Sequence, residues 1–178
     1  MTKIEMFFDC SSPWTYLAVH NIRPLAKEFG AEMVWRPILA GGIFNAINPI
    51  YETPTIPAKR AYSQKDQQDW ARLAGLTIIQ PSVFPVNSVK AMRGCVALEK
   101  EGKLLQFAMG LFKAYWRDNR DISQLTVLTN ICRQIGIGLD TFVAAIEKPE
   151  IKDALRNNTQ EVMGSRRVRV AHHLYQWW

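Results

Sequence analysis

The sequence has little cysteine, no long apolar run and little clustering of charge of one sign. Its 178 residues include three cysteines, Cys10, Cys95 and Cys132, an odd number at wide spacing. This set gives neither a disulfide framework nor the spacing of metal ligands, so we expect no metal and a reducing, cytoplasmic compartment. No apolar run is as long as a membrane span, and the first residues do not form a signal-peptide pattern. We therefore expect no association with a membrane.

The charge is positive but is spread along the chain. The formal net charge is +6, and Arg166, Arg167 and Arg169 lie together near the C-terminus. Elsewhere lysine and arginine alternate with acidic residues, whereas a nucleic-acid surface needs basic residues along one face. We therefore expect no nucleic-acid partner. With 48% hydrophobic residues, the composition is that of a folded globular protein.

The first forty residues follow a strand–helix–strand pattern. Residues 3–9 form a short, apolar, aromatic run that indicates a buried strand. Ser12-Pro13 is typical of a helix start, and Gly30 is a suitable C-cap for a helix that begins there. Residues 32–36 indicate a second strand, ended by Pro37. The three elements have the length of a βαβ unit, so we expect the strands to be parallel.

The middle of the chain changes character. Gly41-Gly42, Pro49, Pro54 and Pro57 predict a long irregular loop. The patterns that follow predict helices over 58–74, 86–102, 104–116, 123–135, 139–147 and from 149 into the region of residue 161. The chain is thus predicted to be an α/β protein with a large helical block.

The candidate for chemistry is the junction between the first strand and the first helix. Ligands of open α/β folds lie at the carboxyl ends of strands, and a helix start offers free N–H groups and a positive dipole end. There Ser12 can donate a hydrogen bond to a ligand's thiolate without being the nucleophile itself. The alternative is that Ser12 serves only as an N-cap before proline, which is common.

Two motifs carry a family resemblance. Met6-Phe7-Phe8-Asp9 is followed by Ser12-Pro13-Trp14-Thr15-Tyr16-Leu17-Ala18. Together they resemble the opening of the 2-hydroxychromene-2-carboxylate isomerases and the related kappa-class glutathione transferases. Further tracts match in order: 35–38, 41–44, 57–62, 69–73, 84–88, 115–116, 120–123 and 158–161.

The resemblance implies a fold and its division. It implies a DsbA-related, thioredoxin-like βαβ core with a large all-helical insertion. Residues 1–40 would be the thioredoxin-like N-terminal half, 41–150 the helical insertion domain and 151–178 the return segment. DsbA-type oxidases carry Cys-Pro-x-Cys where this chain has Ser12 and Thr15, so dithiol chemistry is excluded at this site. Cys10 is expected to be a small buried hydrophobe.

The resemblance also implies a ligand and residues that bind it. The cofactor would be glutathione, with Ser12 catalytic and Ser12, Pro13, Trp14 and Asn48 binding it. Asn48 precedes Pro49 in the loop where the family has a glutathione-binding Asn; Asn45 is a second choice, and an Asn-Pro turn explains Asn48 equally well. Lys59 and Arg60 fit either a carboxylate contact or a solvated helix end.

The implied activity is that of a glutathione-dependent isomerase in the degradation of aromatic compounds, with a small aromatic or chromene-like substrate and a homodimeric assembly. A kappa-like glutathione transferase is the alternative on the same fold. A non-enzymatic thioredoxin-like binding module is the alternative from another class.

The tail departs from the family pattern. After residue 161 the family continues to F-G-x-P-T-[FIM]-F and further strands, whereas this chain reads Arg166 to Trp178. Codons allowed for Val168 to Trp178, read one base later, can encode F-G-S-P-T-I-F-I-N-G. We therefore expect a frameshifted tail from about Gly164, missing C-terminal strands and doubtful activity of this exact chain. The alternative is a divergent native tail that packs at an interface.

Overall fold

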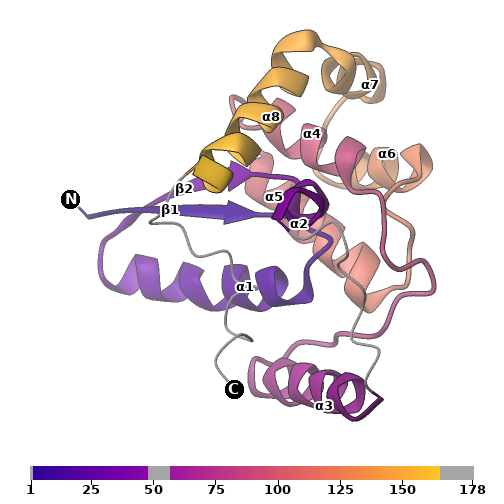
Figure 1. The fold of residues 1–178 in the computed structure, drawn as a ribbon. Helices are drawn as coiled ribbons and strands as arrows, with labels where there is room; N and C mark the ends of the chain where they lie inside the picture. Colours follow the sequence, from indigo (N-terminus) through magenta and orange to yellow (C-terminus); the bar gives the residue numbers. More distant parts are fainter. Residues whose placement is uncertain (1, 48–56, 165–178) are drawn as a thin grey trace.

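The structure, a computed structural model, describes residues 2–47 and 57–164. Its elements follow the order strand, helix, strand and then a series of helices (Figure 1). Asn48 and the tail from residue 165 lie outside the described residues. The predictions made for them therefore stay predictions, and so does the division of the chain at residues 40 and 150.

The two strands are parallel, as predicted. Strand β1 spans Lys3–Phe8 and β2 spans Glu32–Pro37. Their register pairs Lys3 with Glu32 and Phe8 with Pro37. Within the described residues the sheet contains only these two strands. The carboxyl ends of both strands therefore lie at the same edge of the sheet, where the chain turns into helices.

Helix α1 spans Pro13–Glu28 and connects the two strands. Pro13 suits the first turn because that turn needs no backbone donor from it. Pro24 lies inside the helix. Phe29 is the C-cap residue of the helix, and Gly30 follows with a φ of 61°. Such a left-handed conformation favours glycine, as expected at a helix C-terminus.

The prediction of an irregular loop after β2 is wrong for its first part. Helix α2 spans Ala40–Ile47, across the Gly41-Gly42 pair. Tertiary contacts outweigh the low helix propensity of glycine here. Asp9 accepts a hydrogen bond from the Ala40 N–H at 2.9 Å. Ile43 is buried in a small apolar cluster with Ile38 and with Val162.

The helical block was largely predicted, with corrections at two helices. The helix expected over 86–102 is shorter, because α4 spans Val89–Ala97 and the chain then turns through Gly102 at a φ of 64°. The helix expected over 104–116 is α5, Leu104–Phe112, continued by a π-helical turn, η1, over Lys113–Arg117. The remaining helices are α3 (Pro57–Leu73), α6 (Leu125–Gln134), α7 (Leu139–Glu147) and α8 (Pro149–Gly164).

The sheet lies between α1 on one side and the helical block with α8 on the other (Figure 1). Side chains alternate along β1 accordingly: Met6 and Phe8 pack in the main core, and Phe7 packs in the small cluster with Val162 of α8. In the main core, Tyr16 of α1 stacks on Phe112 of α5 at 4.9 Å between ring centroids.

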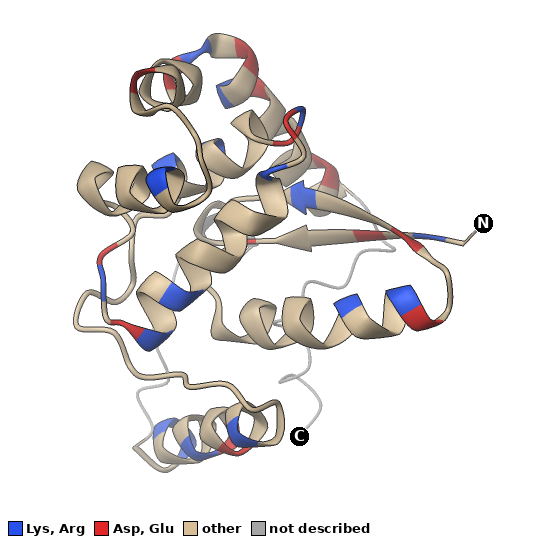
Figure 2. Ribbon diagram, turned by 180° about the vertical axis from the view of Figure 1, so that it is seen from behind, with Lys and Arg blue, Asp and Glu red and all other residues tan. Residues whose placement is uncertain are grey.

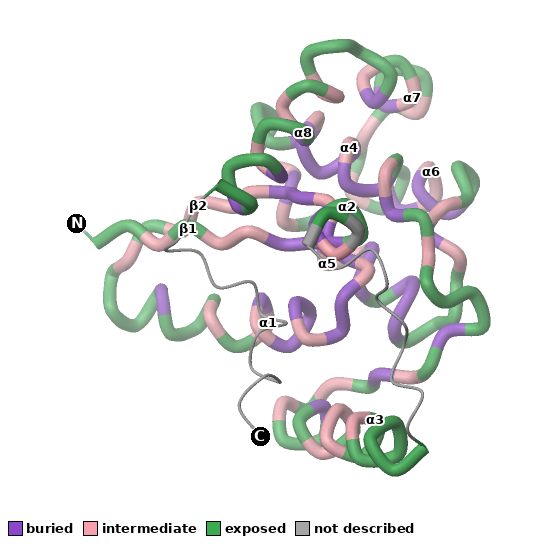
Figure 3. Tube along the Cα trace, in the orientation of Figure 1, coloured by how far each residue is buried: buried purple, intermediate pink, exposed green. Residues whose placement is uncertain are grey.

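The helices differ in how far they are buried. Helices α4 and α5 run through the core, whereas α3 is mostly exposed and buries only Ala71 (Figure 3). Basic and acidic residues are mixed on the same surface helices (Figure 2). Among the helices described, none has both the length and the apolarity to cross a membrane.

An open apolar groove of about 330 Å³ lies between β1 and α1. Ile4 and Met6 line it from the strand, and Ala18, Ile22 and Leu25 line it from the helix. Ser12 is not among its lining residues, so the groove is separate from the junction singled out in the sequence.

Candidate functional site

Ser12 caps helix α1 at the end of β1, as predicted. Its Oγ accepts a hydrogen bond from the Thr15 backbone N–H at 3.2 Å. Its own N–H donates to the Asp9 carbonyl at 3.2 Å, which closes the turn between strand and helix. Because the capping bond uses Oγ as an acceptor, the hydroxyl proton can still be donated to another group.

The start of α1 is electrostatically suited to an anion. The positive end of the helix dipole lies there, and the first turn contains no acidic residue. A thiolate at this position gains from the dipole and from a hydroxyl donor. The residues present thus fit a bound thiol such as that of glutathione.

The junction is closely packed. Ser12 is 4% exposed and Thr15 3%. Trp14, which is half-buried, packs against the main core. Little of Ser12 is therefore exposed to a ligand in this structure.

Asp9 is a buried carboxylate that joins several segments at the junction. It is 1% exposed. Its Oδ1 accepts from the Ser11 N–H at 2.9 Å, and its Oδ2 accepts from the Ala40 N–H at 2.9 Å and the Ser88 hydroxyl at 3.0 Å. Burial raises the pKa of Asp9 above its ordinary value, although hydrogen bonds from Ser11, Ala40 and Ser88 act in the other direction.

Cys10 is a buried, protonated thiol, in keeping with the role predicted for it. Its side chain is 0% exposed. Burial raises its pKa well above the ordinary value, and the neighbouring Cys95 raises it further. Burial also raises the pKa of Cys132, to about 12. All three cysteines are free, buried thiols.

The π-helical turn is tied to the junction. Trp116 donates its indole N–H to the Cys10 carbonyl at 3.0 Å. Next to it, the Tyr115 hydroxyl donates to the Val83 carbonyl at 2.8 Å. Phe84 contacts Trp116 edge-on, with 6.3 Å between ring centroids. The loop before α4 is therefore held against the strand–helix junction through η1.

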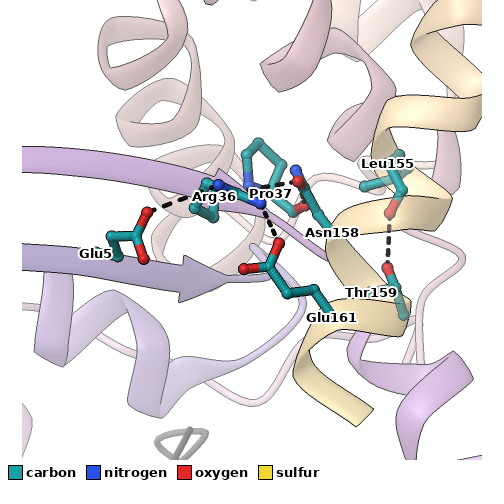
Figure 4. Close-up of polar contacts among 7 residues, drawn as sticks. All are labelled: Glu5, Arg36, Pro37, Leu155, Asn158, Thr159 and Glu161. Atoms are coloured by element: carbon teal, nitrogen blue, oxygen red, sulfur yellow. Dashed lines mark hydrogen bonds and ion pairs between the residues drawn. The ribbon is translucent and has the colours of Figure 1, made fainter. Parts of the chain in front are cut away.

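Helix α8 is held on β2 by polar contacts (Figure 4). Arg36 donates to Asn158 Oδ1 at 3.1 Å and pairs with Glu161 and, at 3.7 Å, with Glu5. Asn158 Nδ2 donates to the Pro37 carbonyl at 3.0 Å. Thr159 Oγ1 accepts from the Leu39 N–H at 3.1 Å. These contacts fix the residues that lead from β2 into α2.

The other candidates that the structure describes are Lys59, Arg60 and Asn45. Lys59 and Arg60 are exposed in the first turn of α3, which agrees with a solvated helix end. Asn45 belongs to α2. Over residues 2–47 and 57–164, no group of His, Cys, Asp and Glu could hold a metal ion.

Two residues of the site were missed in the sequence. Asp9 and Ser88 were quoted only as parts of motifs, and neither was given a role. The available signal was the position of Asp9, an acid directly after a buried strand. A charged side chain so placed must be buried with partners or turn outward. Its partners, Ala40 and Ser88, are too far along the chain to be found from local pattern.

Fold and site together define a thioredoxin-like protein with Ser12 and Thr15, and no pair of cysteines, at the start of its first helix. Residues 3–166 match the DSBA-like thioredoxin domain model. The chain therefore belongs to the DSBA-like thioredoxin domain family.

Named relatives narrow the family context. The chain is 22% identical over 170 residues to glutathione S-transferase kappa 2 of Caenorhabditis elegans, covering 91% of this chain and 76% of that protein. It is 25% identical over 130 residues to 2-hydroxychromene-2-carboxylate isomerase of Pseudomonas putida, covering 71% of this chain and 63% of that enzyme. The match thus spans less than two thirds of that isomerase.

A solved structure confirms the fold. The structure of selenomethionine 2-hydroxychromene-2-carboxylate isomerase superposes with a TM-score of 0.80 at 20% identity. The match covers 91% of this chain and 79% of that one. The expected thioredoxin-like fold with its helical block is therefore confirmed, as is the resemblance to the isomerase and transferase families.

Proposed function

We propose that this protein is a glutathione-dependent isomerase of the 2-hydroxychromene-2-carboxylate type. The observation that supports it most is Ser12, a capping serine with a free hydroxyl proton at the start of α1. Relatives named as an isomerase and as a kappa glutathione transferase support the same class of chemistry. The substrate would be a small aromatic or chromene-like molecule.

In this proposal Ser12 donates its hydroxyl proton as a hydrogen bond to the glutathione sulfur. The dipole of α1 lowers the pKa of that thiol. Glutathione would supply a thiolate for reversible nucleophilic catalysis. Pro13 and Trp14 flank the thiol, and Asn48 is proposed to bind the peptide part of glutathione. The protein is proposed to act as a cytoplasmic homodimer, without nucleic acid or membrane as partner.

Glutathione binding to the wild-type chain, measured by calorimetry, is the first test. Turnover of a hydroxychromene carboxylate is the second. If Ser12 stabilises a thiolate by one hydrogen bond, Ser12→Ala should slow turnover about 10- to 150-fold, equal to about 1.5–3 kcal/mol. Ser12→Cys should not restore the rate, because the nucleophile belongs to glutathione.

Thr126→Ala is the matched control, because Thr126 is an exposed hydroxyl in the first turn of α6. Its rate should equal that of the wild type. Equal turnover in Ser12→Ala and the wild type would leave Ser12 with only its capping role.

Two other functions compete. A kappa-like glutathione transferase is favoured by the relative of that name, and conjugation of glutathione to a standard electrophile without isomerisation would identify it. A non-enzymatic binding module is favoured by the 4% exposure of Ser12. Failure of the wild-type chain to bind glutathione would support the module and contradict both enzymes.

A further inference from the structure

Three helix starts meet at one buried carboxylate. The donors to Asp9 are the N–H of Ser11, the N–H of Ala40 and the hydroxyl of Ser88. Ser11 directly precedes the cap of α1, Ala40 is the first residue of α2 and Ser88 is the N-cap residue of α4. Asp9 therefore connects the amino ends of α1, α2 and α4.

The hydrogen bond from Ser88 to Asp9 replaces the usual capping bond at the start of α4. A serine at an N-cap position normally accepts a bond from the helix backbone. Ser88 makes no such capping bond, and its hydroxyl donates to Asp9 instead. The Ser88 hydroxyl thus stabilises the contact with Asp9 rather than the start of α4.

The charge of Asp9 does not explain its place beside a thiolate site. An anionic carboxylate disfavours a second negative charge nearby. The same effect acts on its other neighbours: burial is the main cause of the raised pKa of Cys10 and of Tyr115, and the charge of Asp9 adds to both shifts. Electrostatics alone would therefore place a neutral residue here, so the value of Asp9 must lie in its hydrogen bonds.

We propose that Asp9 is a positioning residue of the thiol site: by binding the starts of α1, α2 and α4 it fixes Ser12 and the first turn of α1 against the ligand's sulfur. This inference rests on the proposed function. A carboxylate suits the task because it accepts from all three donors at once. The amide of an Asn would turn an N–H₂ group toward one of them.

The test is the pKa of the thiol of bound glutathione, read from thiolate ultraviolet absorbance across pH. Asp9→Asn has two opposed effects. Loss of the negative charge lowers this pKa, whereas loss of the positioning of Ser12 and the helix dipole raises it. We expect a rise of about one unit, a tenfold loss of thiolate. Asp140→Asn, which removes an exposed carboxylate from the first turn of α7, should leave the pKa of the bound thiol unchanged.

Ser88→Ala provides a second variant, should Asp9→Asn fail to fold. It keeps the Asp9 carboxylate and removes the hydroxyl that donates to it. Like Asp9→Asn, it should raise the pKa of the bound thiol. Ser88→Thr, which retains the hydroxyl, should restore it. If the pKa of the bound thiol is lowered or unchanged in folded Asp9→Asn, or in Ser88→Ala, the inference about Asp9 is wrong. The proposed function still holds in that case, provided that the variants bind glutathione. A wild-type chain that binds no glutathione would overturn both.

Discussion

Arg36 on β2 donates its Nε–H to Asn158 Oδ1 on α8 at 3.1 Å, across 122 positions of the chain. Asn158 in turn donates to the carbonyl of Pro37, the residue after Arg36. The Asn158 side chain thus bonds both the side chain of Arg36 and the backbone of Pro37 at the end of β2 (Figure 4). This contact lies directly before the residues that lead into α2, which begins at Ala40.

Asn158→Ala should therefore lower the free energy of unfolding. It removes two hydrogen bonds and leaves the partly buried Arg36 guanidinium without one partner. We expect a loss of about 1–3 kcal/mol, measured by urea denaturation. Asn157→Ala is the matched control, because Asn157 is exposed on the same helix. Equal stability of the two variants would show that the contact does not hold α8 on β2.

Gly94→Ala should destabilise the helical block. A Cβ on Gly94 would lie 2.6 Å from Phe107 and 2.9 Å from Phe142, in the contact between α4, α5 and α7. Overpacking of this kind costs about 1–3 kcal/mol. Gly41→Ala is the control, because no atom lies within 4 Å of its added Cβ. In α2 that change should be neutral or stabilising, and unfolding of both variants by heat measures the difference.

The stability that Asp9 contributes should fall as pH rises. Burial raises its pKa above the ordinary value of 3.8, so the folded protein holds this proton more tightly than the unfolded chain. The contribution is therefore complete below 3.8 and is lost as pH passes through the folded-state pKa. The difference in unfolding free energy between wild type and Asp9→Asn should decrease from acid toward neutral pH. Urea titrations at stepped pH measure it, and a difference that grows with pH would contradict it.

Much of the fold followed from local pattern. The apolar run before Asp9 and the Ser12-Pro13 pair predicted β1 and the start of α1, because a strand, an N-cap and a proline at the first turn are determined by a few neighbouring residues. The π-helical turn at Tyr115 and Trp116 and the helix across Gly41-Gly42 were not predicted, because both depend on contacts with distant segments.

Several of the tracts that carry the family resemblance are joined to one another by hydrogen bonds. Asp9 binds Ser88 from the 84–88 tract, and Arg36 binds Asn158 from the 158–161 tract. Trp116 of the 115–116 tract binds the backbone of Cys10. Sequence comparison identified these tracts in order but not their partners, since nothing local pairs Asp9 with a residue 79 positions away. The role of Ser12 with a ligand remains a prediction.

The last prediction restores a dithiol at the start of α1. Ser12 and Thr15 lie one turn apart, and the bond between Ser12 Oγ and the Thr15 N–H at 3.2 Å shows the close approach of the two residues. We expect cysteines at both positions to come close enough to form a disulfide. The double variant Ser12→Cys/Thr15→Cys would carry two thiols besides the three native ones. Oxidised dithiothreitol should remove two of the five, counted with a thiol reagent after unfolding.

The single variants Ser12→Cys and Thr15→Cys should keep all their thiols under the same oxidation. The native cysteines Cys10, Cys95 and Cys132 are buried, and Cys10 is held protonated. The helix dipole should also lower the pKa of the thiol introduced at Ser12, since a thiolate at a helix start is stabilised. An oxidised double variant that retained five thiols while folded would show that the start of α1 differs from the geometry described. Loss of thiols in the Ser12→Cys single variant would instead show that a native cysteine reaches the site.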